Sequence, residues 1–202
     1  AVIDGQVFGR LIPSKAVKLV RELSHHILDI VENALEAGAT HVEVRIVEDS
    51  KANRLTIEIA DNGRGMDPET LARVGDPFFT TRTTRHVGLG IPLFKAAAER
   101  CNGSVRIHSI PGMGTRILAD FERDHIDRAP LGDMVSTLMG ILLARSQCRL
   151  TYCHQLDDRT FAFDTQEIHS ILGDLSLSHP RVRAWIQEFL EKGEKGLYRV
   201  TF

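Results

Sequence analysis

The sequence lacks the features that mark secreted and membrane-spanning proteins. Its 202 residues include only three cysteines, which cannot all pair, and its start shows no charged leader followed by a long apolar run. The longest nearly apolar stretch, residues 131–143, contains Asp133 and is shorter than a membrane-spanning helix. We therefore expect a cytoplasmic protein without membrane contact, and a buried helix at 131–143.

The chain also lacks an excess of charge of either sign. It has 25 lysine and arginine residues against 27 aspartate and glutamate residues, which leaves a net charge of -2. This balance gives no electrostatic reason to expect nucleic acid as a partner. The hydrophobic fraction of 43% is typical of a protein that buries a core, and the length predicts one full domain with a smaller addition.

Hydrophobic periodicity predicts alternating helices and strands. Apolar spacings of three and four predict a first helix that starts after Ser14 as N-cap and ends near Gly38. Alternation then predicts a hairpin, and later segments follow the same two patterns. The predicted order is strands at 42–46 and 55–59, helices at 68–74 and 89–101, strands at 104–110 and 115–121, helix 131–146, strands 148–155 and 159–164, helices 165–173 and 180–192, and a last strand at 198–202.

Changes in composition and in hydrophobic periodicity divide the chain into four parts. We predict a lead at residues 1–13, a main domain at 14–121, a linker at 122–130 and a small α/β region at 131–202 whose role no motif reveals. Within the main domain, residues 75–87 combine glycine, proline, threonines and basic residues with little periodicity, which predicts a mobile loop.

The first motif with chemical content lies on the first predicted helix. Asp29 and Asn33 are four residues apart, so they share a helix face. A carboxylate and an amide at this spacing can hold a hydrated Mg²⁺ ion, and the carboxylate can orient or deprotonate a water molecule. Two polar residues at the solvated edge of a helix would have the same spacing.

The second motif, Asp61-Asn62-Gly63-Arg64-Gly65-Met66, follows a predicted strand. A carboxylate at a strand end can accept a hydrogen bond from an exocyclic amine such as the 6-amino group of adenine. Glycines in such a loop let the backbone turn sharply and approach a flat ligand. A plain Asp-Asn-Gly turn is an equally good interpretation of this motif taken alone.

Two glycine motifs follow. Gly88-Leu89-Gly90 opens a predicted helix, where bare backbone N–H groups favour an anion such as a triphosphate, although a flexible hinge would have the same pattern. Gly112-Met113-Gly114-Thr115 lies between two predicted strands. It is either a tight hairpin or a turn whose Thr115 helps to close the adenine end of a pocket.

Taken together and in this order, the four motifs resemble the N, G1, G2 and G3 boxes of the GHKL ATPases, the family of sensor histidine kinases, DNA gyrase, Hsp90 and MutL. The resemblance covers about residues 20–121. Residues 76–81 are similar to the F box of sensor histidine kinases, and residues 32–39 to the N box of MutL. The resemblance implies a Bergerat-type two-layer α/β sandwich, in which a mixed, mostly antiparallel sheet carries helices on one face.

The resemblance also implies the ligand, ATP with Mg²⁺, and the residues that contact it. Asn33 would bind the metal, Asp61 would bind the adenine amino group, and residues 75–87 would be the ATP lid. Asp29 stands where ATPase members carry a catalytic glutamate, one methylene longer. The expected nucleotide contacts are Asn33, Asp61, Gly63, Gly65, Met66, Thr80, Thr81, Arg82, Arg85, Gly88, Leu89, Gly90 and Thr115.

The function implied is that of a stand-alone regulatory ATPase or kinase that acts on or with a partner protein. A non-catalytic module that senses ATP against ADP, and an anti-sigma-type protein serine kinase, are the alternatives. The segment Ser178-His179-Pro180 followed by Trp185 is similar to the tails of ATP-binding companions of bacterial redox enzymes. A redox enzyme complex or a regulator is therefore the expected partner, and a homodimer is a further expectation.

Overall fold

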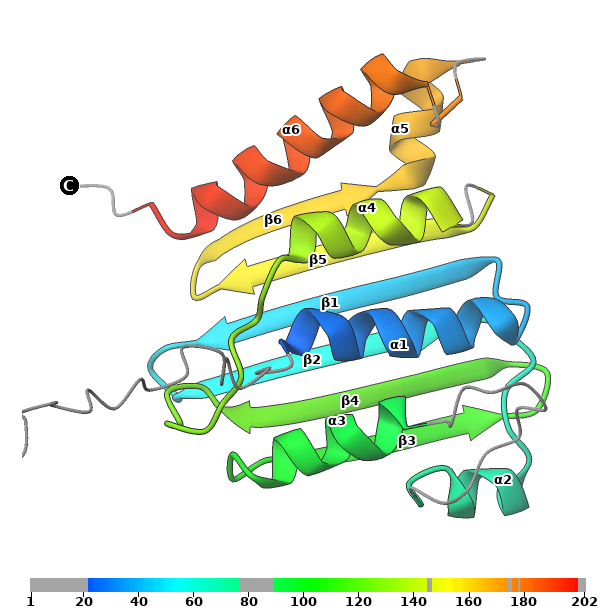
Figure 1. Cartoon of the computed structure of the whole chain (residues 1–202), viewed down its shortest axis with the longest axis vertical. Coiled ribbons are helices and arrows are strands. Elements are labelled where there is room, and N and C mark those ends of the chain that lie inside the picture. Colours follow the sequence, from blue (N-terminus) through cyan, green and yellow to red (C-terminus); the bar gives the residue numbers. More distant parts are fainter. Residues whose placement is uncertain (1–21, 77–88, 145–146, 174–175, 178, 200–202) are drawn as a thin grey trace, which may run out of the picture.

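The computed structural model describes residues 22–76, 89–144, 147–173, 176–177 and 179–199. Its strands form a six-stranded sheet in the order β3-β4-β2-β1-β5-β6 (Figure 1). All neighbours are antiparallel except β1 and β5, which run parallel, so the predicted mixed and mostly antiparallel sheet is confirmed. The strands are β1 (His41–Asp49), β2 (Arg54–Asp61), β3 (Ser104–Ile110), β4 (Gly114–Glu122), β5 (Arg149–Leu156) and β6 (Arg159–Asp164).

The helices cover one face of this sheet, as expected for a two-layer sandwich. In Figure 1, α1, α3 and α4 lie in front of the strands, with α1 between the other two. The helices are α1 (Leu23–Glu36), α2 (Pro68–Arg73), α3 (Gly90–Glu99), α4 (Met134–Ala144), α5 (Thr165–Leu172) and α6 (Pro180–Leu197). None of the helices in the described part of the chain combines the length and the apolar character needed to cross a bilayer.

The core lies between the two layers because the strands alternate in burial. Val42, Val44 and Ile46 of β1 are fully buried, while the residues between them are exposed. On the helix side, the spacing of three and four residues turns one apolar stripe of α1 toward these strands. The α1 residues buried there are Leu23, Ile27, Ile30, Val31, Ala34 and Leu35. Burial of each large side chain contributes about 1.5–3 kcal/mol.

The start of α1 differs from the prediction. Ser14 lies outside the described residues, but Glu22 has extended backbone angles (φ -65°, ψ 153°) and precedes the helix, so Ser14 is not its N-cap. The predicted end is close to the observed one, because Gly38 follows the C-cap Ala37 with a φ of 82° and donates its N–H to the carbonyl of Leu35. Such a left-handed residue is the usual way to end a helix.

The C-terminal region does not form a sheet of its own. Strand β5 pairs with β1, with Val44 opposite Tyr152, and β6 pairs with β5, so both strands extend the main sheet. Helix α6 lies on the same face as α1, since its Glu194 accepts a hydrogen bond from the buried Tyr152 hydroxyl at 2.9 Å. The strand predicted at 198–202 is wrong at its start, because Tyr198 caps α6; residues 200–202 lie outside the described part.

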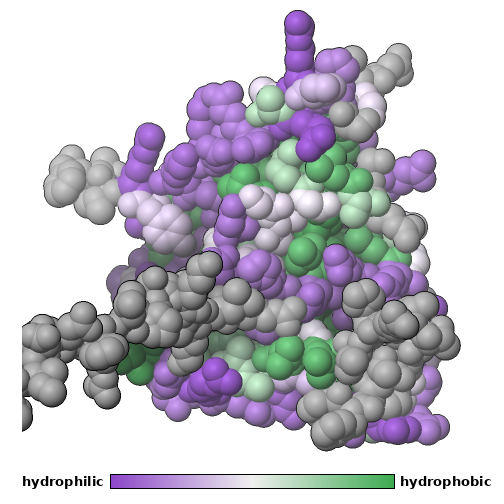
Figure 2. Space-filling model, viewed as in Figure 1, coloured by the Kyte–Doolittle hydropathy of each residue, from purple (hydrophilic) through white to green (hydrophobic). Residues whose placement is uncertain are grey.

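Helix α4 starts three residues later than predicted and is apolar on nearly all sides, while residues 145 and 146 of the predicted helix lie outside the described part. Its inner side chains, including Leu138 and Ile141, are buried, but Val135, Met139 and Leu143 follow one another at intervals of four and stay partly or largely exposed. Figure 2 shows hydrophobic side chains at the surface over the part of the helix layer where α4 lies. The apolar stretch at 131–143 therefore builds both core and surface.

Candidate nucleotide-binding site

Asp61 ends β2 on the helix-covered face of the sheet, because it continues the alternation of Leu55, Ile57 and Ile59. One of its carboxylate oxygens accepts a hydrogen bond from the backbone N–H of Gly63 at 2.8 Å. Burial raises the pKa of this carboxyl group above its ordinary value, while backbone N–H groups of Gly63 and Thr115 oppose the rise. The carboxylate is thus held in one orientation, as a fixed acceptor needs to be.

The loop after Asp61 is tied to two other segments. The N–H of Arg64 donates to the carbonyl of Ala37 at the end of α1 (3.0 Å), and the carbonyl of Arg64 accepts from the N–H of Gly112 in the β3–β4 turn (2.7 Å). Asn62 secures the start of β1, since its side-chain oxygen accepts from the N–H groups of Thr40 and His41. The end of α1, the loop and the hairpin therefore form one rigid corner.

Two of the motif glycines are required by this corner itself. Gly65 has a φ of 66°, and a Cβ atom there would lie 2.1 Å from the carbonyl oxygen of Ile110. Gly114 has a φ of 102°, and a Cβ atom would lie 1.9 Å from the carbonyl oxygen of Asp61. Any side chain would clash with backbone at both positions. The packing of loop against hairpin thus gives these glycines a role besides the predicted approach to a ligand.

Ser109 of β3 is a residue that the sequence reasoning missed. It is buried, and its hydroxyl meets the N–H of Met66 (2.8 Å), the carbonyl of Gly114 (3.0 Å) and the Thr115 hydroxyl (2.8 Å). It therefore links the loop to both strands of the hairpin. The alternation of Val105, Ile107 and Ser109 along the strand would have placed it on the covered face, but not against Met66.

Asp29 and Asn33 lie on α1, and both are half-buried. Gly90, at the start of α3, packs so close to this helix that a Cβ atom there would lie 3.0 Å from the Cβ of Asp29. The N-cap residue Leu89, an apolar residue, makes no side-chain capping bond to the N–H groups at the start of α3. These groups carry partial positive charge beside Asp29.

The structure thus brings most of the predicted nucleotide residues to one side of the sheet. Asp61, Gly63, Gly65, Met66 and Thr115 meet in the corner at the end of β2, and α1 connects that corner with the start of α3. The predicted contacts Thr80, Thr81, Arg82, Arg85 and Gly88 lie outside the described residues. A hollow of about 480 Å³ between the ends of α1 and α4 contains none of the predicted residues.

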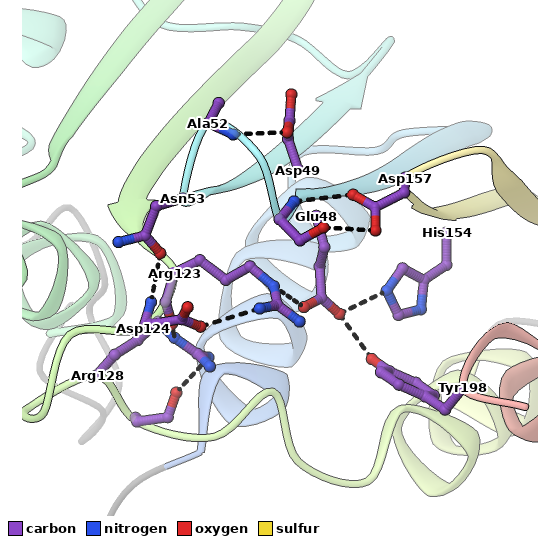
Figure 3. A network of polar contacts seen from close by, with 12 residues as sticks. Glu48, Asp49, Ala52, Asn53, Arg123, Asp124, Arg128, His154, Asp157 and Tyr198 are labelled. Atoms are coloured by element: carbon purple, nitrogen blue, oxygen red, sulfur yellow. Dashed lines mark hydrogen bonds and ion pairs between the residues drawn. The ribbon is translucent and has the colours of Figure 1, made fainter. Parts of the chain in front are cut away.

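A second polar cluster, which no sequence pattern indicated, lies toward the other end of β1 (Figure 3). Glu48 is buried and accepts hydrogen bonds from Arg123 (3.0 Å) and from Tyr198 (2.6 Å), and it lies 3.2 Å from a ring nitrogen of His154. The other ring nitrogen of His154 lies 2.9 Å from Glu194 of α6. This cluster joins β1, β5, α6 and the segment after β4.

The charges of this cluster follow from its geometry. A carboxylate can only accept hydrogen bonds, so both nitrogens of His154 must donate, which makes the ring an imidazolium. Burial alone would lower the pKa of His154, but the hydrogen bonds to Glu194 and Glu48 raise it to about 9. Burial alone would raise the pKa of Glu48, but hydrogen bonds from His154, Tyr198 and Arg123 lower it to about 2.

Comparison with known proteins identifies the family of this chain. Residues 19–125 match the model of a family described as histidine kinase-, DNA gyrase B-, and HSP90-like ATPases. Over 89 residues the chain is 44% identical to the sensor protein kinase FleS of Pseudomonas aeruginosa, a match that covers 44% of this chain and 22% of that protein. It is 34% identical over 99 residues to a putative sensor protein of Shewanella frigidimarina, covering 48% of this chain and 15% of that one.

The fold has a counterpart among solved structures. The crystal structure of the N-terminal domain of a DNA repair protein is similar with a TM-score of 0.50 at 13% identity, covering 76% of this chain and 57% of that one. The chain spans about a fifth of the length of the curated relatives that it matches. Because the family match contains α1, the loop after Asp61 and the β3–β4 hairpin, the chain belongs to the histidine kinase-, DNA gyrase B- and HSP90-like ATPases.

Proposed function

We propose that this chain binds Mg-ATP along one stripe of α1 and transfers its γ-phosphoryl group. The stripe consists of Asp29, Asn33 and Ala37, which are spaced by four and so share a helix face. Ala37 bonds the loop that holds Asp61, and Asp29 touches the start of α3 at Gly90. Eight residues at 1.5 Å each span roughly 12 Å, comparable with the length of an extended nucleoside triphosphate. This stripe carries the proposal.

Each end of the stripe has the chemistry that its part of the nucleotide needs. Asp61 is a fixed acceptor for the exocyclic amine of adenine. The start of α3, where Leu89 makes no side-chain cap, offers partial positive charge for phosphates. Asn33 supplies a side-chain oxygen atom that would hold Mg²⁺, which keeps several waters and phosphate oxygens and needs few protein ligands. A bound Mg²⁺ would neutralise charge that develops during phosphoryl transfer.

The proposed acceptor of the phosphoryl group is a side chain of a partner protein. The relatives are named as a sensor kinase and a sensor protein, which supports a partner protein's side chain over water as the acceptor. Asp29 would orient the attacking group, since a carboxylate one helical turn from Asn33 reaches the same phosphate. A specific observation favours the alternative of an ATP-sensing switch, because Asp29 is one methylene shorter than glutamate.

Replacement of Asn33 by alanine tests the metal site. We expect Asn33→Ala to weaken Mg-dependent ATP binding at least about 10-fold, since an oxygen ligand is lost. Calorimetric titration with ATP, in the presence of Mg²⁺ and with EDTA, measures the effect. Glu32→Ala is the matched control, because Glu32 is the exposed neighbour on another face of α1. An affinity for Mg-ATP within twofold of the parent would contradict the assignment of Asn33.

Replacement of Asp29 by asparagine separates the catalytic and the switch functions. With γ-labelled ATP, we expect Asp29→Asn to lower label transfer at least about 100-fold while ATP affinity changes less than about threefold, as for loss of a catalytic carboxylate. The assay is run alone and with cell extract, so that label on phosphate, on this chain or on another protein identifies the acceptor. If Asp29→Asn transfers label at the parental rate, Asp29 has no catalytic role.

A further inference from the structure

Three polar side chains form a row across three strands at the end of the sheet. Asp61 of β2 lies opposite Thr115 of β4, and Thr115 lies opposite Ser109 of β3. Residues directly opposite each other in antiparallel strands project from the same face. The row therefore continues the helix-covered face on which Ile59, Ile117 and Ile107 precede it, and Thr115 stands between the other two.

The hydrogen bonds of Ser109 determine where each hydroxyl proton of the row points. A hydroxyl group carries one proton and two acceptor lone pairs, and a carbonyl oxygen can only accept. The Ser109 hydroxyl accepts from the N–H of Met66 and donates to the carbonyl of Gly114. We assign its single proton to the carbonyl of Gly114, which can only accept, and Thr115 is then the donor in the contact of 2.8 Å between the two hydroxyl groups.

This assignment gives Thr115 a defined character toward a ligand. Because its proton points to Ser109, the Thr115 oxygen presents only lone pairs beside the Asp61 carboxylate, which also only accepts. A base that meets this end of the site therefore faces acceptors alone. A 6-amino purine offers two N–H donors there, whereas a 6-oxo purine offers an acceptor oxygen, which would be left unpaired against Thr115 and Asp61.

We propose that Ser109 is a specificity-positioning residue, which selects 6-amino over 6-oxo purine nucleotides by holding the Thr115 hydroxyl as an acceptor. This inference rests on the proposed nucleotide site. Ser109 itself is buried behind Thr115 and bonded to the backbone on two sides, so it acts through Thr115. Without Ser109, the Thr115 hydroxyl can rotate and donate its proton to a 6-oxo group.

The ratio of dissociation constants for ITP and ATP, measured by calorimetric titration, tests this proposal. ITP carries the 6-oxo group with a protonated N1, where ATP has the 6-amino group with an unprotonated N1, and the two nucleotides share the sugar and the triphosphate. We expect the parent protein to prefer ATP strongly and Ser109→Ala to reduce this preference about 10-fold, as rejection of unpaired polar groups predicts. A purely structural effect of the substitution would weaken both nucleotides equally and leave the ratio unchanged.

Further variants keep the test decisive. Ser109→Thr retains the hydroxyl group and should keep the parental ratio of dissociation constants. If Ser109→Ala does not fold, Ser109→Cys replaces it in the test, because cysteine has a similar shape and only a weak hydrogen-bonding group. Ser109→Cys should then show the reduced preference expected of Ser109→Ala. In a Thr115→Val background, Ser109→Ala should no longer change the ratio. If Ser109→Ala and Ser109→Cys bind ATP and keep the parental ratio of ITP and ATP dissociation constants, the role of Ser109 is wrong and the proposed nucleotide site still stands. If the parent binds neither nucleotide, the proposed function is itself wrong.

Discussion

An Asp61→Asn variant should bind ATP about 50-fold more weakly than the parent protein, or worse. The substitution keeps the shape of the side chain and leaves one oxygen to accept from the N–H of Gly63, so the loop can keep its conformation. The second oxygen is replaced by an NH₂ group, which is a donor and therefore cannot accept a hydrogen bond from the 6-amino group of adenine. Loss of a hydrogen bond to a charged group costs about 1.5–3 kcal/mol, and each 1.4 kcal/mol is a factor of ten in affinity.

A control on the same strand separates this effect from a general loss of structure. Glu58 lies three residues before Asp61 and projects from the opposite face of β2, where it pairs with Arg116. Glu58→Gln should therefore leave ATP affinity within about twofold of the parent, since exposed ion pairs contribute little. Equal affinities of Asp61→Asn and the parent, measured by titration at constant Mg²⁺, would show that Asp61 does not contact the base.

A Glu48→Gln variant should be less stable than the parent by about 3 kcal/mol, since the buried His154 imidazolium and the half-buried Arg123 lose a counter-charge that they share. Glu48 is 6% exposed and is the shared acceptor of Arg123, His154 and Tyr198, so the loss affects three hydrogen bonds together. Urea unfolding followed by far-UV circular dichroism measures the difference. Glu43→Gln is the control, because Glu43 is exposed on the same strand. Equal unfolding midpoints for Glu48→Gln and Glu43→Gln would contradict this account.

The same cluster should make stability depend on pH. The pKa of His154 is about 9 in the folded chain against an ordinary value of 6.5, so its contribution is complete below about pH 6.5 and is lost as the pH rises through about 9. The gap corresponds to about 3 kcal/mol. Glu48 acts at the other end of the scale, since its contribution is complete above about pH 4.5 and is lost as the pH falls through about 2.

Measurement of the unfolding free energy at pH 6 and pH 10 tests the part due to His154. The parent should lose more stability between these values than a His154→Gln variant, in which no imidazolium forms. Glu194 of α6 is hydrogen-bonded to His154 and Tyr152, so the loss of stability at high pH should affect α6 before the rest of the sheet. Hydrogen exchange of α6 amides, compared with those of β2, would then show faster opening of α6 at high pH. Parallel stability profiles for parent and variant would contradict the charged state of His154.

Local patterns predicted the elements well because periodicity and end signals belong to short segments. The strands predicted at 159–164 and 104–110 have the observed bounds, and those of the first hairpin lie within the observed strands. The errors occur at element ends, where tertiary contacts decide. Helix α6 continues past the predicted end at residue 192 to Leu197, and Gly193 lets it pack closely against β6, since a Cβ atom there would strike the ring of Phe161.

The sequence alone determined the family, the sheet-and-helix class and the candidate residues from Asp29 to Thr115, because the spacing of the four motifs is a property of the linear chain. Only the tertiary structure decided that β5 lies beside β1 and that Ser109 meets Met66, 43 residues away. The same is true of Glu48, which meets His154 and Tyr198 across 106 and 150 residues. Such contacts follow from the packing of whole layers, and no local preference of the chain specifies them.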